Sequence, residues 1–185
     1  MQKAHEFFCN YGMLAEYHIP ACNLIGSSIQ NRVRLTLEVT KAVTEIWDGD
    51  CVGIRISPTG TFNAMSDSDP QHLYHHLVEK LNPFNLAYLH VVERFGEAND
   101  DNFNFMTLRE SFNGAYIANG GYTAESAEVS LKNNQSDFIS FGKMFISNPD
   151  LPKRFKEQTW LNEPDQTTFY GGDEKGYIDY PFLNE

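Results

Sequence analysis

Two short apolar segments, residues 115–118 and 137–141, constrain the fold more than any other feature of the chain, because each ends in a glycine turn. The turns are Asn119-Gly120-Gly121-Tyr122 and Gly142-Lys143. A helical segment, residues 123–132, separates the two apolar segments. Two parallel strands joined by a helix bring the turns that follow them to the same end of a sheet. The pattern therefore predicts an α/β fold with both glycine turns at one sheet end.

The glycine turns have two interpretations that the motif alone leaves open. Backbone N–H groups at a turn with little side chain can hold a phosphate group. Glycine is also the ordinary residue of tight turns, with no ligand involved.

The rest of the chain continues the alternation of strands and helices. Residues 52–58 and 86–93 are almost continuously apolar, which is typical of parallel strands covered on both faces. Amphipathic helices are predicted over residues 29–47 and 73–81. Ser27, with a glutamine three positions later, has the pattern of a capping box at the start of the first helix. The sequence therefore predicts four strands, each of which is followed or preceded by a helix.

Arg55 is a charged residue inside the otherwise apolar segment 52–58. A buried charge needs a partner, because desolvating it alone is costly. An internal salt bridge and an outward position on an edge strand both account for it.

Composition excludes several classes of function. A net charge of −11 argues against nucleic acid or an anionic membrane as a partner, since both bind basic surfaces. No apolar run approaches the length of about 20 residues that spans a bilayer, and the N-terminus does not have the pattern of a secretory signal. The 185 residues suit one domain but not a complete eight-fold α/β barrel, which needs about 200 or more.

The three cysteines are odd in number and unpatterned. This usage favours a reducing, cytoplasmic location over a disulfide framework or a zinc site. His72 and His76 share a helix face, but no third ligand is placed to complete a site. The sequence therefore predicts no metal centre.

Four separate motifs resemble the C-terminal half of the old yellow enzyme family, in the order in which the family has them. They are GSSIQNR at residues 26–32, NGGYTAESAE at 119–128, FGKMFISNPDLPKRF at 141–155 and TFYGGDEKGYIDYPFL at 168–183. This family contains FMN-dependent ene-reductases, including 12-oxophytodienoate reductases and N-ethylmaleimide reductases. The resemblance implies the second half of a TIM (β/α)8 barrel, about four β/α units, with an FMN-binding domain over residues 26–185.

The resemblance also implies site residues. Arg55 would lie under the flavin pyrimidine, where a permanent charge stabilises the anion of the reduced flavin. Tyr122 would pack near the dimethylbenzene edge of the flavin, and Tyr170 would lie by the substrate. The phosphate would be held by backbone N–H groups near Gly120, Gly121 and Gly142, with the cation of Lys143 beside it. The family usually has arginine at position 143; lysine keeps the charge but loses the bidentate fork.

Residues 1–25 do not match the family. A histidine at a strand end, followed three residues later by His or Asn, would bind the substrate there, and neither His5 nor His18 has these neighbours. Phe7, Tyr11 and Leu14 have the spacing of a short amphipathic helix instead. We therefore assign no catalytic histidine.

The function implied by the resemblance is that of a flavoprotein oxidoreductase. NADH or NADPH would reduce FMN, and the reduced flavin would reduce a small electrophilic substrate, an activated alkene or a nitro compound. Because the match covers only the second half of the family, we expect a truncated form. Its edge strands, 52–57 and 137–141, would be open to a second copy or to a complementary half-barrel chain.

Two alternatives remain open on the sequence. One is a non-catalytic remnant or interaction protein with a degraded flavin site. The other is a half-barrel that binds a different phosphate ligand, which would need the glycine turns but not Arg55.

Overall fold

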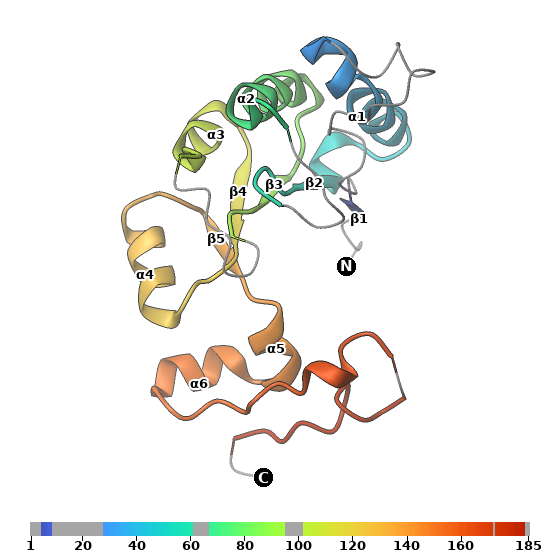
Figure 1. Ribbon diagram of the computed structural model, residues 1–185. Helices are drawn as coiled ribbons and strands as arrows, with labels where there is room; N and C mark the ends of the chain where they lie inside the picture. Colours follow the sequence, from blue (N-terminus) through green and yellow to red (C-terminus); the bar gives the residue numbers. More distant parts are fainter. Residues whose placement is uncertain (1–4, 9–27, 61–66, 95–101, 172, 184–185) are drawn as a thin grey trace. The chain divides into compact units, whose positions relative to one another are not determined.

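The structure is a computed structural model that describes residues 5–8, 28–60, 67–94, 102–171 and 173–183 (Figure 1). The chain divides into two compact units, Met1–Ile139 and Ser140–Glu185. Each unit has its own packing, and each is described by itself.

A five-stranded sheet in the order β1-β2-β3-β4-β5 forms the centre of the first unit. The strands are β1 (His5–Phe8), β2 (Val52–Ile56), β3 (Tyr88–Val92), β4 (Ala115–Asn119) and β5 (Phe138–Ser140). The pairs β1–β2, β2–β3 and β3–β4 are parallel. The order follows the sequence, as expected when each crossover adds the next strand to the same side.

Strand β1 corrects the prediction of a helix near the N-terminus. His5 pairs with Val52 and Phe8 with Arg55, so this segment is extended. The N–H and C=O groups along one side of β2 can pair with an extended chain. Pairing of residues 5–8 with β2 outweighs the weak helical preference of this segment. Strand β2 is consequently an inner strand and not the open edge that we expected. The remainder of the predicted helix, from Cys9 onward, lies outside the described residues.

Among its described residues, the first unit has four α-helices: α1 (Ile29–Thr44), α2 (Pro70–Leu81), α3 (Phe105–Ser111) and α4 (Ala124–Lys132). Short 3-10 turns, Gly49–Cys51 and Asn82–Phe84, precede β2 and β3. Helix α1 begins at Ile29, as predicted, but its N-cap is Ser28 and not Ser27, because the Ser28 side chain accepts from the Asn31 N–H. Thr123 and Ser126 cap α4 reciprocally.

The core lies between one face of the sheet and helices α1, α2 and α3, which lie along the same side of it (Figure 1). Alternate strand residues point to opposite faces. The helix-facing set is buried and apolar: Val52, Ile54, Ile56, Leu89, Val91, Tyr116 and Ala118. The register places Arg55 beside His90, and His90 beside Ile117, on the other face. The second face is therefore the one on which the polar residues lie.

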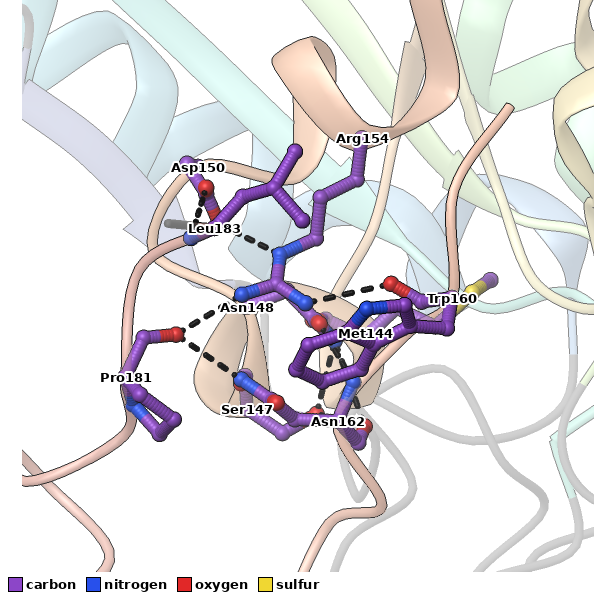
Figure 2. A network of polar contacts seen from close by, with 9 residues as sticks. All are labelled: Met144, Ser147, Asn148, Asp150, Arg154, Trp160, Asn162, Pro181 and Leu183. Atoms are coloured by element: carbon purple, nitrogen blue, oxygen red, sulfur yellow. Dashed lines mark hydrogen bonds and ion pairs between the residues drawn. The ribbon is translucent and has the colours of Figure 1, made fainter. Parts of the chain in front are cut away.

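The second unit contains α5 (Lys143–Ser147), α6 (Leu151–Glu157) and a 3-10 turn at Gln166–Thr168. Figure 2 shows Arg154, which is fully buried, at the centre of its polar contacts. Its guanidinium donates to Asp150 Oδ1 at 2.6 Å, to the Trp160 carbonyl at 3.1 Å and to the Pro181 carbonyl at 2.8 Å. One planar fork thereby joins α6 to two distant points of the tail.

A pair of asparagines extends this network (Figure 2). Asn162 N–H donates to Asn148 Oδ1 at 2.7 Å, and the Asn162 amide donates to the Ser147 carbonyl at 2.7 Å. Asn148 in turn donates to the Met144 carbonyl at 2.9 Å. Polar contacts with defined directions, more than an apolar core, hold the tail against its helices.

Among the described helices, none combines the length and the apolar character that crossing a bilayer would need.

Candidate functional site

The carboxyl ends of β2 and β4 bring together two polar side chains on the inner face of the sheet, the face that α1, α2 and α3 do not cover. Arg55 Nη2 donates to Asn119 Oδ1 at 3.3 Å. Arg55 is half-buried, and its Nε is buried without a hydrogen-bond partner among the described residues. A buried donor without a partner is uncommon and calls for an explanation. The guanidinium therefore carries donor capacity that the described protein groups do not use.

The glycine turn that follows β4 requires glycine at its first position. Gly120 has φ +108° and Gly121 has φ +70°, which side chains rarely adopt. A Cβ on Gly120 would lie 2.3 Å from the Arg94 carbonyl oxygen and 2.7 Å from the Arg94 nitrogen. The turn thus packs backbone against backbone at the end of β3, and Gly121 remains exposed.

Tyr122, at the end of this turn, shares an acid with a second tyrosine. Its hydroxyl donates to Glu93 Oε2 at 2.6 Å, and the Tyr116 hydroxyl donates to Glu93 Oε1 at 2.9 Å. Burial raises the pKa of Glu93, while the two tyrosine hydrogen bonds act in the opposite direction. Burial and the neighbouring Glu93 raise the pKa of both tyrosines. Tyr122 is therefore fixed in position by Glu93.

The other predicted site residues lie in the second unit. Gly142 is the N-cap of α5 with φ −93°, and open space surrounds the position of its absent Cβ. Lys143 is the first residue of α5. Tyr170 is fully exposed, and its ring contacts Phe169 edge to face at 6.4 Å between centroids. The structure brings Arg55 together with the end of β4. The cofactor and substrate roles of all the predicted site residues stay predictions.

Sequence reasoning missed Asn119 and Glu93 as parts of the site. Asn119 had a local signal, since it is the last strand residue before the glycines and so lies at the sheet end. Glu93 had a weaker one, a single acid that closes an apolar strand. Neither signal predicts the contact partner, because Asn119 contacts Arg55, 64 positions away, and Glu93 contacts Tyr122, 29 positions away.

The described residues contain no group of three side chains suited to hold a metal ion.

Comparison with known proteins connects this geometry to a family. Residues 14–162 match the NADH:flavin oxidoreductase / NADH oxidase family, so the match begins within the segment 1–25 in which the sequence motifs showed no resemblance. The chain is 38% identical over 163 residues to 12-oxophytodienoate reductase 2 of Arabidopsis thaliana, a match that covers 85% of this chain and 44% of the relative. The chain belongs to the NADH:flavin oxidoreductase / NADH oxidase family.

Solved structures agree with this assignment. Morphinone reductase superposes with a TM-score of 0.88 at 38% identity, covering 96% of this chain and 50% of that one. The old yellow enzyme from Trypanosoma cruzi gives a TM-score of 0.81 at 37% identity, covering 85% and 42%. The chain thus spans about half the length of the proteins it matches. The predicted fold, half of a TIM-barrel old yellow enzyme, is confirmed.

Proposed function

We propose that this chain binds FMN at the inner face of its sheet and serves NAD(P)H-dependent reduction of small electrophilic compounds. Activated alkenes and nitro compounds are the substrate classes that the family resemblance implies. Family membership supports the proposal, as does the likeness to morphinone reductase, one structure of which contains tetrahydroNAD.

The observation that carries the proposal is the convergence of Arg55 with the Gly120-Gly121 turn at the carboxyl ends of β2 and β4, the parallel strands on either side of β3. Barrel enzymes build their sites at this end of the strands. A cofactor with a phosphate and a polar ring needs N–H donors for the first and a cation for the second. The uncovered turn and the partly unused guanidinium fit these needs.

The residues have separable tasks in this proposal. Bound FMN would supply hydride transfer between NAD(P)H and the substrate. Arg55 offers a positive charge and a planar set of donors to an anionic acceptor. The backbone N–H groups at Gly120 and Gly121 bind phosphate, and Tyr122 presents an aromatic ring beside them. Gly142 and Lys143 as further phosphate contacts, and Tyr170 as a substrate contact, are parts of the proposal that rest on the resemblance.

The test is an absorption spectrum of the purified chain after incubation with FMN and gel filtration. We expect a flavin band that elutes with the protein at one flavin per chain. Arg34→Ala, which removes an exposed arginine of α1, is the matched control for Arg55→Ala. Retention of flavin by wild type and by Arg34→Ala, with loss in Arg55→Ala, supports the assignment.

The outcome that contradicts the proposal is a folded wild-type chain that retains no flavin. The chain would then act as a non-catalytic interaction protein, the alternative that the sequence leaves open. The elution volume in the same run reports whether a second copy accompanies flavin binding, as the expected pairing of open sheet edges would require.

A further inference from the structure

Glu93 is a partly buried acid whose hydrogen bonds with two tyrosines have no role in the proposed chemistry. It directly follows β3, and its two carboxyl oxygens accept from Tyr116 and Tyr122, at 2.9 and 2.6 Å. Within the described residues these oxygens meet hydroxyl groups and form no ion pair. Arg94 supplies a nearby positive charge but no ion pair among the described residues. Burial of an acid without an ion pair is unfavourable, so the arrangement needs a reason beyond the stability of β3.

The two tyrosines come from opposite ends of one segment. Tyr116 is a fully buried residue of β4, and Tyr122 ends the glycine turn that follows β4. Glu93 therefore holds both ends of the segment that carries Gly120 and Gly121. A carboxylate can accept several hydrogen bonds at once, which no other side chain of this size does as well.

The backbone repeats the same connection. Glu93 N–H donates to the Asn119 carbonyl at 2.8 Å, and the next residue, Arg94, fills the space beside Gly120. The direction of the N–H groups in the turn is thus set by contacts with Glu93 and Arg94. A shift of Glu93 would rotate the turn or loosen it.

We propose that Glu93 is the positioning residue of the glycine turn, Asn119–Tyr122, and that its carboxylate holds the turn in the conformation that binds the FMN phosphate. This inference rests on the proposed function. Glu93 acts through Tyr122 and Asn119 and does not itself contact the cofactor.

The charge state of Glu93 provides a readout that a purely structural residue would not give. Protonation turns one carboxyl oxygen into a donor, so one tyrosine loses its acceptor. The groups that face this carboxyl are Tyr116, Tyr122 and the charge of Arg94, with Arg109 near Tyr116. Burial raises the pKa of Glu93 above the ordinary value of 4.5. FMN affinity should therefore fall on acidification at a pH above 4.5.

The test uses Glu93→Gln and Tyr122→Phe, with Glu128→Gln as a control, since Glu128 is an exposed acid on α4. Amide hydrogen exchange at residues 119–122 is measured in the flavin-free chain, and FMN affinity by fluorescence titration across pH. We expect exchange at the turn to accelerate, and FMN affinity to fall, by about tenfold in Glu93→Gln, roughly the effect of one lost hydrogen bond. Glu128→Gln should match wild type in both.

The pH profile completes the test, because the FMN phosphate titrates equally in every variant. The acid-dependent loss of affinity should be present in wild type and flattened in Glu93→Gln. Unchanged exchange and an unchanged pH profile in variants that bind FMN would overturn the positioning role alone. Wild-type protein that does not bind FMN would overturn the proposed function and this inference with it. Tyr122→Phe keeps the test usable if Glu93→Gln does not fold.

Discussion

Replacing Gly120 by alanine should destabilise the Met1–Ile139 unit by at least about 2 kcal/mol. A residue with a side chain held at φ +108° carries backbone strain of about 1–3 kcal/mol. The new Cβ would also lie 2.3 Å from the Arg94 carbonyl oxygen, and relieving such overpacking costs about 1–3 kcal/mol. The obstructing atoms are backbone atoms at the end of β3, so no side-chain rotation relieves the contact.

Gly142→Ala is the matched control, because both glycines are predicted to contact the same phosphate. Gly142 has a negative φ and nothing within 4 Å of its missing Cβ. Its substitution should change stability by less than about 1 kcal/mol. The two variants therefore share a predicted function and differ in predicted strain.

The chain provides its own probes for this measurement. Its two tryptophans, Trp47 and Trp160, lie in different units. In a Trp160→Phe background, urea unfolding followed by tryptophan fluorescence reports the first unit, and so Gly120→Ala, through Trp47 alone. In a Trp47→Phe background, Trp160 reports the second unit, and so the control Gly142→Ala. A free energy of unfolding for Gly120→Ala within about 0.5 kcal/mol of wild type, the ordinary range for neutral substitutions, would refute the described turn geometry.

Three further predictions concern charge. At an FMN concentration that saturates the variant, Arg55→Ala should slow reduction of FMN by NAD(P)H about 100-fold or more in stopped-flow absorbance, because a donor to a developing anion is lost; rates equal to those of Arg34→Ala would remove Arg55 from the mechanism. Arg154→Met should destabilise the Ser140–Glu185 unit by about 3 kcal/mol, since it removes a fully buried charge from its partners; Trp160 fluorescence in a Trp47→Phe background reports this, with exposed Lys153→Met as control. The raised pKa of Glu93 means that the folded state binds this proton more tightly than the unfolded state, so its contribution to stability should decline as pH rises from 4.5 through the raised value; thermal melts across pH should show a flatter profile for Glu93→Gln, and parallel profiles would contradict it.

Local patterns predicted most of the elements in the first unit. The apolar segments around Arg55, around His90 and before Gly120 are β2, β3 and β4. A short apolar run between turns can be recognised as a strand from the local sequence alone. The N-cap of α1 was displaced by one residue, from Ser27 to Ser28, since two adjacent serines both have the chemistry of a cap.

Local patterns did not predict the interactions between segments that are distant in the sequence. Residues 5–8 carry a weak helical pattern and yet form β1, because β2, 47 residues away, offers its backbone groups. Glu93 shows in sequence only as a charge after a strand. Its two tyrosine partners are 23 and 29 residues further on.

The sequence by itself thus determined strands β2 to β5, helices α1, α2 and α4 and the positions of the glycine turns, since these depend on periodicity and on the conformational freedom of single residues. Only the tertiary structure decided which side chains meet: Arg55 with Asn119, Glu93 with Tyr116 and Tyr122, and Arg154 with the tail. Such pairings depend on strand register and on burial. Burial also raises the pKa of Glu93, and it encloses the Arg55 Nε, which has no hydrogen-bond partner among the described residues. Those quantities arise from the packed chain and from no local segment of it.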